Sequence, residues 1–357
     1  MIRLRVTLTL SLVFVSAIVL ASLMVGLARE PADVPLAIGS FLRGIAGSPT
    51  AIGATGRTLT PVLLVGVAAC ISFRAGLFDV GQVGQFVLGG VVAGAVAAIA
   101  PGPGLLTIAI SLSAGAATGG LWSLMVARVS AATGMQLVVL SLIANYLAEG
   151  LGRLATRTLF QDPKAYSLIA TRLVPEDAWL ATLLPRTSLH AGIIIALLAF
   201  AAMGVVLLRN SIGHRVTMFG YNPIAAALAG VRVTRFQSGI LSVTGAICGA
   251  AGAIEVLGTF HRYQDASLGG PNSIAWTGVI AVILVPGRVL AAGREGALSA
   301  SDAGRRRRHL AWRPRSLPQC DAPGDRRPRR MGPDLRAAAA ADAPPRAFRS
   351  VRRGRRA

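Results

Sequence analysis

Residues 83–127 read VGQFVLGGVVAGAVAAIA, then PGPG, then LLTIAISLSAGAATGGLWSLMVA, so two long apolar runs flank a short turn at 101–104. A helix needs about 20 mostly apolar residues to cross the hydrocarbon core of a bilayer. Pro and Gly end helices and form turns. This stretch therefore predicts two transmembrane helices with a sharp turn between them.

The same pattern recurs along the chain, which is 53% hydrophobic and 14% charged, against about a quarter charged in soluble domains. We expect an all-α, polytopic transmembrane helical bundle over residues 1–287. Its eight candidate spans are 6–27, 58–74, 83–100, 105–127, 135–151, 189–208, 237–258 and 274–287. The first is longer than the apolar region of about 7–15 residues in a cleaved signal peptide, so it is expected to remain as a helix. Residues 30–57, with three prolines, predict an interfacial segment.

The charge of the chain is concentrated in its last part. Residues 288–357 hold 19 Arg against 6 acidic residues, a net charge of +13. Arg exceeds Lys by 35 to 1 and Ala, Gly and Pro are abundant, which favours a frameshifted product of GC-rich DNA that has lost its last helices. The alternative is a genuine disordered basic tail, since such composition cannot form a core. That tail would bind anionic lipid rather than nucleic acid, because few aromatic residues accompany the arginines.

Lys and Arg beside short loops predict which side of the membrane each loop faces. If the N-terminus lies on the inner side of the membrane, more of the Lys and Arg residues beside short loops fall on the inner side than on the outer side. The inner set is Arg3, Arg5, Arg74, Arg128, Arg209, Arg215, Arg232 and Arg235. The outer side then receives Arg29, Arg43 and Arg57, and a long loop at 152–188 with both signs of charge.

The residues of common enzyme and metal sites are missing from the sequence. Lys164 is the only lysine, so no Gly-x-x-x-x-Gly-Lys-Ser/Thr phosphate loop is present. The four His and three Cys residues have no metal-ligand spacing. Cys70 and Cys248 lie in apolar runs and are expected to pack in the core. No catalytic residue, metal ligand or cofactor is predicted, and the chain itself is not expected to be an ATPase of this type.

A polar, glycine-rich stretch interrupts the apolar pattern at 72–85. Its candidate pathway residues are Gly76, Phe78, Asp79, Gly81, Gln82 and Gln85. Polar groups at membrane depth avoid lipid and face protein or water, and transporters build sites from glycine-broken helices. The alternative is a plain cytoplasmic turn with solvated side chains. Asn145 and Glu149, one turn apart on the fifth span, are further pathway candidates, with helix–helix hydrogen bonding as the alternative.

A second interruption, at 219–233, predicts a short helix in a cytoplasmic loop. Asn222 is suited to the N-cap and Pro223 to the first helical position. Gly230 is suited to end the helix. Such a helix could dock into a groove on a cytoplasmic partner, or could simply reverse the chain. Within the spans, Gly90–Gly94, Gly115–Gly119 and Gly245–Gly249 have the spacing that permits close helix contact.

These segments resemble a known family. Residues 73–85, FRAGLFDVGQVGQ, resemble the FRAGLFNIGxEGQ signature of permeases that import nucleosides and simple sugars, and 218–231 resemble their G-x-N-x-x-A-A-x-x-A-G-I segment. Residues 142–147 and 186–192 resemble two further runs of the same family. Order and spacing agree over residues 5–285, and ribose-type and branched-chain amino-acid permeases share the pattern more weakly.

The resemblance implies a subunit of a bacterial ATP-driven importer in the cytoplasmic (inner) membrane. Its partners would be a cytoplasmic ATPase subunit, a second permease subunit and an external substrate-binding protein. The ATPase-coupling residues it implies are Gly220, Asn222, Pro223, Ala226 and Gly230. The solute would cross by alternating access near 76–85.

Three departures from the family pattern bear on function. Asp79 stands where the signature has Asn, and Val83 where it has Glu. After Pro286 the basic tail replaces further apolar helix. The alternatives to a nucleoside or sugar permease are an inactive or truncated permease, a branched-chain amino-acid or ribose-type permease, and a secondary transporter.

Overall fold

The computed structural model describes residues 39, 43–44, 47–99, 102–165, 169–270 and 273–284. Within these residues the chain is helical, with only isolated β-bridges between loops. The α-helices are α3 (Pro49–Arg74), α4 (Gln82–Ile99), α5 (Gly104–Thr133), α6 (Leu137–Ala155), α7 (Gly192–Arg209), α8 (Ser211–Tyr221), α9 (Pro223–Leu228), α10 (Val233–Glu255), α11 (Asp265–Leu268) and α12 (Ile274–Ile283). The π-helical turns η2 (Thr156–Phe160) and η4 (Val256–Phe260) extend α6 and α10, and η3 (Glu176–Ala178) is a 3-10 turn.

Six of these helical segments are long and apolar enough to cross a membrane. They are Pro49–Arg74, Gln82–Ile99, Gly104–Thr133, Leu137–Phe160, Gly192–Arg209 and Val233–Phe260. The predicted all-α helical bundle is confirmed, and each of these segments overlaps a predicted span. The predicted span at 6–27 and the tail at 288–357 lie outside the described residues. The last predicted span, 274–287, is described as a helix of ten residues.

The prediction of an interfacial segment at 30–57 is wrong for its last part. Helix α3 begins at Pro49, nine residues before the predicted span. Ser48 caps it by accepting a hydrogen bond from the Ala51 amide at 3.1 Å, and Pro49 occupies the first helical position. Proline there starts a helix instead of breaking one.

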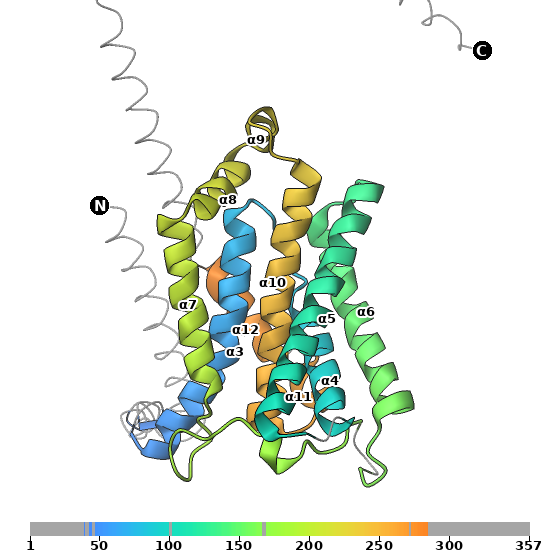
Figure 1. Ribbon diagram of the computed structural model, residues 1–357, viewed down its shortest axis with the longest axis vertical. Coiled ribbons are helices and arrows are strands. Elements are labelled where there is room, and N and C mark those ends of the chain that lie inside the picture. The colour runs from blue at the N-terminus through green and yellow to red at the C-terminus, as the bar shows by residue number, and fades with distance from the viewer. Residues whose placement is uncertain are drawn as a thin grey trace, which may run out of the picture. The chain divides into compact units, whose positions relative to one another are not determined.

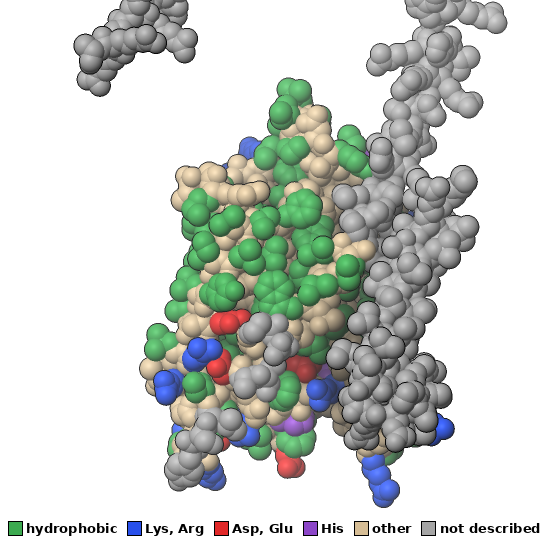
Figure 2. Space-filling view, turned by 180° about the vertical axis from the view of Figure 1, so that it is seen from behind, with side chains coloured by type: hydrophobic (Ala, Val, Ile, Leu, Met, Phe, Trp, Pro, Cys, Tyr) green, Lys and Arg blue, Asp and Glu red, His purple; other side chains and the backbone are tan. Residues whose placement is uncertain are grey.

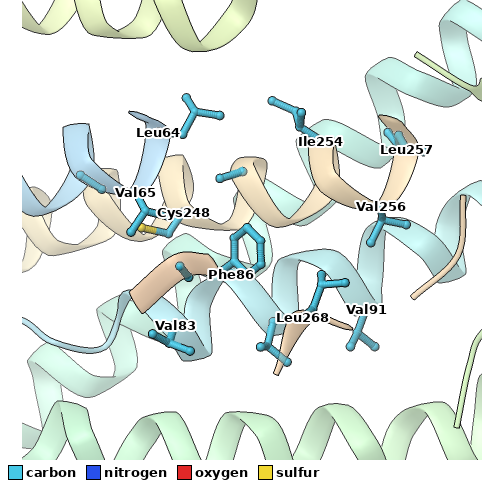
Figure 3. Packing of buried hydrophobic residues seen from close by; sticks show 14 of the residues in the cluster. Leu64, Val65, Val83, Phe86, Val91, Cys248, Ile254, Val256, Leu257 and Leu268 are labelled. Atoms are coloured by element: carbon cyan, nitrogen blue, oxygen red, sulfur yellow. The ribbon is translucent and has the colours of Figure 1, made fainter. Parts of the chain in front are cut away.

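Helices α4 and α10 form the interior of the bundle. Figure 1 shows α10 beside α3 and α5, with α7 and α6 further out. Most of α4 and α10 is buried, whereas most of α7 is exposed. Their apolar side chains meet in the core drawn in Figure 3, where Phe86 and Val91 of α4 lie near Cys248 and Ile254 of α10. Cys248 packs in the core as predicted, while Cys70 is half-buried.

Glycines set how closely the central helices approach. A Cβ on Gly249 of α10 would come within 3.0 Å of the Gly119 Cα on α5, and closer still to the Gly115 carbonyl oxygen. A Cβ on Gly89 of α4 would collide with the Gly249 backbone. The predicted pairs Gly115–Gly119 and Gly245–Gly249 therefore face each other across α5 and α10. Backbones in direct contact gain the van der Waals packing that holds helices together in lipid.

The surface of the described bundle is apolar along most of its length. Figure 2 shows hydrophobic side chains over the middle, with most of the charged side chains in view gathered at the end opposite α9. Large apolar residues stand outward on several helices, including Leu105, Leu121, Tyr146, Leu154, Leu198 and Leu208. An exposed apolar belt of this extent is solvated by lipid, not water.

The end of the bundle opposite α9 is closed by residues 169–191. This cap loop donates backbone hydrogen bonds to the chain after α10: Thr171 N–H to the Tyr263 carbonyl at 3.0 Å, Val174 N–H to His261 at 2.8 Å and Leu180 N–H to Leu257 at 3.1 Å. It begins later than the predicted loop at 152–188 because α6 and η2 continue to Phe160.

His190 at the end of the cap loop is a buried, neutral histidine. Its Nδ1 accepts from the Gly192 amide at 3.2 Å, so the ring proton is on Nε2, 3.3 Å from the Thr259 hydroxyl. Burial, with the nearby charge of Arg57, lowers the pKa of His190 to about 4.

The glycine contact between α5 and α10 can be tested with two alanine substitutions. Both Gly249→Ala and Gly204→Ala add a methyl group inside a helix, which favours helix by about 1 kcal/mol. Gly204 has open space around its Cα, whereas Gly249 does not. We expect G249A to lose about 1–3 kcal/mol of stability from overpacking, seen as a lower Tm in detergent, and G204A to keep or raise the Tm. An equal Tm for both variants would contradict the packing.

Candidate coupling and translocation sites

The 75–81 loop turns the chain from α3 back into the bundle. It starts with the Leu77 amide bonded to the Ser72 carbonyl at 2.9 Å and with Gly76 at φ +71°, a conformation that favours glycine. Asp79 then accepts a hydrogen bond from the Gly81 amide through Oδ1 at 2.8 Å. This side chain-to-backbone bond, two residues apart, is typical of an Asp-led turn. It places the Asp79 carboxylate at the start of α4.

Asp79 is buried, with 2% of its surface exposed. Gln85, one turn into α4, donates to Asp79 Oδ2 at 3.1 Å. Burial raises the pKa of Asp79, and the hydrogen bonds from Gly81, Gln85 and Ser141 oppose that rise. The alternative of a turn with solvated polar side chains is therefore wrong for Asp79, Gln82 and Gln85, which are all buried.

Two side chains of α6 hold the 75–81 loop and the start of α4 in place. Ser141 Oγ accepts from the Val80 amide at 3.1 Å. Asn145 donates from Nδ2 to the Val80 carbonyl at 2.8 Å and accepts at Oδ1 from the Gly84 amide at 2.8 Å. Residues four apart on a helix share a face, so these two side chains act together. Asn145 thus has the helix–helix hydrogen-bonding role that was the alternative for it.

The remaining predicted pathway residues divide into different environments. Gln82 is fully buried, and its side-chain amide has no hydrogen-bond partner in the described part of the chain. Phe78 is 54% exposed, with its ring centroid 5.3 Å from that of Phe73. Glu149 does not join this group, since it accepts from the Gly270 amide at 3.1 Å, near the cap loop.

Helix α9 has the caps that its sequence predicts. Asn222 Oδ1 accepts from the amides of Ile224 and Ala225, both at 3.0 Å, and Pro223 is the first helical residue. At the other end Gly230 has φ +88°, and the Val231 amide bonds to the Ala226 carbonyl at 3.0 Å. That bond, with the left-handed glycine, is a Schellman cap.

The apolar side chains of α9 point away from the rest of the bundle. Ile224 is 74% and Leu228 87% exposed, while Ala226 is buried against the bundle. In Figure 1, α9 lies beyond the ends of α10 and α8. Two neighbouring exposed apolar residues on a doubly capped helix form a rigid surface that a protein partner could cover.

Helix α8, which precedes α9, is a feature that the sequence analysis missed. Asn210 caps it through the Ile212 amide at 3.3 Å. Its C-terminal end packs on the 75–81 loop, because a Cβ on Gly76 would lie 3.2 Å from the Gly220 Cα and 3.1 Å from its carbonyl oxygen. A Cβ on Gly220 would collide with the Arg74 carbonyl. Gly220 therefore contacts the loop directly instead of forming part of α9.

A hydrogen bond supports the same contact. Arg74, the last residue of α3, donates from Nε to the Thr217 hydroxyl of α8 at 2.9 Å. The 75–81 loop is thus held on one side by α6 and on the other by α8. Through α8, the loop connects the start of α4 with α9.

The described chain is thus a polytopic helical bundle with a short, doubly capped helix at one end. The family described as branched-chain amino acid transport system / permease component matches residues 51–293, more than half of the chain. The chain therefore belongs to this permease family, and it is a transport subunit. No solved structure matches it.

Three curated relatives agree with this assignment. A guanosine ABC transporter permease of Bacillus subtilis is 31% identical over 246 residues, which cover 68% of this chain and 69% of the relative. A nucleoside ABC transporter permease of Lactococcus lactis is 26% identical over 62% of this chain and 64% of its own length. A glucose ABC transporter permease of Haloferax volcanii is 26% identical, over 58% of this chain and 57% of its own length. The chain thus spans less than two thirds of the last two relatives.

Replacement of Asn145 tests how the 75–81 loop is held. Asn145→Ala removes the side-chain partner of the part-buried Val80 carbonyl and of the buried Gly84 amide, and a buried group left unpaired costs about 1–3 kcal/mol. We expect a clear fall in Tm in detergent and faster hydrogen exchange at residues 80–84. Tyr146→Ala, at the exposed next position of α6, is the control and should leave exchange at 80–84 unchanged. Unchanged exchange in N145A would contradict this role.

Proposed function

We propose that this chain is the membrane-spanning subunit of an ATP-driven importer that moves nucleosides or simple sugars by alternating access. The observation that carries the proposal is its 31% identity to the guanosine permease over two thirds of both chains. The similarities to a nucleoside and to a glucose permease support the same range of solutes. Nucleosides and sugars share a hydroxylated ring, so one polar pathway could be adapted to either.

The partner that hydrolyses ATP is proposed to dock on α9. The chain has one lysine and no phosphate-binding loop, so the energy must come from another subunit. The exposed pair Ile224 and Leu228 would insert into a groove of that ATPase, as an amphipathic helix does. The capping residues Asn222, Pro223 and Gly230, with Ala226 packed behind them, would keep α9 rigid, and Gly220 would connect it to the 75–81 loop. A second permease subunit and an external binding protein complete the proposed importer.

This proposal places α9 and the N-terminus in the cytoplasm, with the cap loop outside the bacterial inner membrane. Residues 192–254 contain four Arg and no Lys, Asp or Glu, and all four Arg lie at the end of the bundle that carries α8 and α9. An excess of positive charge beside short loops marks the cytoplasmic side.

The solute pathway is proposed to pass the start of α4. Gln82 is fully buried with both amide atoms free of partners in the described part of the chain. A buried polar group without a partner is costly, so it is suited to meet water or a polar solute when the pathway opens. Gly76, Phe78, Asp79, Gly81 and Gln85 would shape the same region. Asn145 would position it, and Glu149 would act at the outer end.

A second candidate is an inactive permease remnant. Two observations favour it: the family match ends at residue 293, and the composition changes after Pro286 to Arg-rich sequence with a net charge of +13 over 288–357. In this alternative, a frameshift replaces the last apolar helices. A measurement of ATP-dependent solute uptake into vesicles separates the two candidates.

Uptake into vesicles tests the proposal. The chain is co-expressed with the ATPase, second permease and binding protein of its own operon, and ATP-dependent uptake of labelled guanosine, glucose and leucine is compared. We expect uptake of guanosine or glucose. Leucine uptake alone would favour an amino-acid permease, and no uptake of any solute would favour the remnant.

Substitution of Leu228 tests the docking helix separately. Leu228→Asp puts a charge where an apolar side chain should be covered, so we expect at least a tenfold loss of co-purified ATPase. Leu173→Asp, at a leucine that is 55% exposed in the cap loop at the other end, is the control and should leave ATPase binding unchanged. If L228D retained the ATPase, α9 would not be its docking helix.

A further inference from the structure

An apolar groove with a single cationic residue opens on the side of the bundle. It has a volume of about 560 Å³ and is formed by α3, α7, α8 and α10. Val67, Met203, Val216 and Val243 represent the four helices in its lining. Every lining residue is apolar or glycine except Arg235, in the first turn of α10. The volume is in the range of ligand sites, so the groove is large enough for part of a lipid.

Arg235 has no anionic partner among the described residues. The ion pair found among the described residues joins Arg153 and Asp265, at the other end of the bundle, and Arg235 has no hydrogen bond there either. Its surroundings add positive charge instead: residues 192–254 contain Arg209, Arg215 and Arg232 besides Arg235, and no Asp or Glu. The exposed Arg235 guanidinium beside this apolar groove is therefore free to pair with an anion from outside the described protein.

We propose that this groove binds an anionic phospholipid, with an acyl chain between α7 and α10 and the phosphate on Arg235. The ligand must combine a long apolar part with a negative charge, and an anionic phospholipid has both. Basic residues at the membrane surface attract such headgroups, and Arg pairs well with phosphate. Residues 6–27 could fill an apolar groove, but they contain no Asp or Glu to neutralise Arg235.

Because the groove lies between α8 and α3, a lipid bound in it would restrict how far α8 can move. Ile212 and Val216 of α8 line the groove together with Val67 and Ile71 of α3. A bound acyl chain would brace α8 against α3, next to the bond between Arg74 and Thr217. The bracing of α8 matters for transport only if α9 docks on the ATPase as proposed, because α8 leads into α9, and this part rests on the proposed function. The lipid site itself depends on the groove and on Arg235.

The test compares two lipids with the same tails. The full-length chain, purified in mild detergent, is titrated with dioleoylphosphatidylglycerol or with dioleoylphosphatidylcholine, and the Tm is recorded. We expect only the anionic lipid to raise the Tm at low concentration. Arg235→Gln should weaken its apparent affinity about fivefold, the contribution of one Arg at an anionic surface. Arg128→Gln is the control, because Arg128 is an exposed Arg of α5 outside the groove.

A second pair of variants fills the groove without changing charge. Val243 is 56% exposed and lines the groove, so Val243→Trp should fold and block the acyl chain. Leu198→Trp, on the exposed side of α7 and outside the lining, should keep the lipid effect. We expect V243W to lose the stabilisation by phosphatidylglycerol and L198W to retain it.

Three results would overturn the proposal. Equal stabilisation by the zwitterionic lipid would mean that any lipid fills the groove. Equal weakening by R235Q and R128Q would mean that only overall charge matters. A cross-link from Val243→Cys to residues 6–27 in native membranes would show that the chain fills its own groove. None of these measurements uses transport, so the lipid site and the proposed function can fail independently.

Discussion

The structure depends on how the polar backbone of the 75–81 loop is satisfied inside a bundle surrounded by apolar surface. A buried amide or carbonyl without a partner is costly, and lipid offers none. Here Ser141 and Asn145 of α6 bond to Val80 and Gly84, and Asp79 bonds to Gly81. With these bonds the chain can turn at Gly76 and return into the bundle as α4. These bonds hold the start of α4, and further along the same helix Gly89 packs against Gly249 of α10.

The 75–81 loop lies between the two sites of the proposed mechanism, the solute pathway at the start of α4 and the docking helix α9. On one side it is fixed to α6, and on the other it packs on α8 through Gly76 and Gly220. We propose that movement of α9 on a partner would reach α4 through this contact, because backbone atoms that touch directly transmit displacement without side-chain rearrangement. Phe78, exposed at the centre of the loop, would move with it.

Much of the fold could be predicted from the sequence, because apolar runs and proline or glycine signals are local. The six long apolar helices of the described residues and both caps of α9 are of this kind. The start of helix α3 is harder to predict, because a proline such as Pro49 can either break a helix or be its first residue, as it is here. Helix α8 was missed because its apolar pattern is short, although Asn210 at its start was a usable capping signal.

The candidate site was harder to predict, since it depends on contacts between distant segments. Ser141 lies 61 residues from Val80 in sequence, and only the packing of α6 on α4 brings them together. The spacing of Ser141 and Asn145 by four residues was the available signal. Glu149 continues that spacing but bonds near the cap loop, because one more turn carries it toward the opposite end of α6. The spacing of residues in the sequence shows which side chains share one face of a helix, but it does not show which other segments that face contacts.

The central claim is that the 75–81 loop is held between α6 and α8 and so connects α8 with α4. Hydrogen exchange after a substitution at Gly220 tests this claim most directly. A methyl group at Gly220 would collide with the chain at Arg74 and Ala75, whereas one at Gly204 meets open space. The account predicts that Gly220→Ala speeds amide exchange at residues 77–85 as well as in α8, and that Gly204→Ala changes neither. If G220A loosened α8 alone and left 77–85 fully protected, the loop would not be held by α8 and the account would be contradicted.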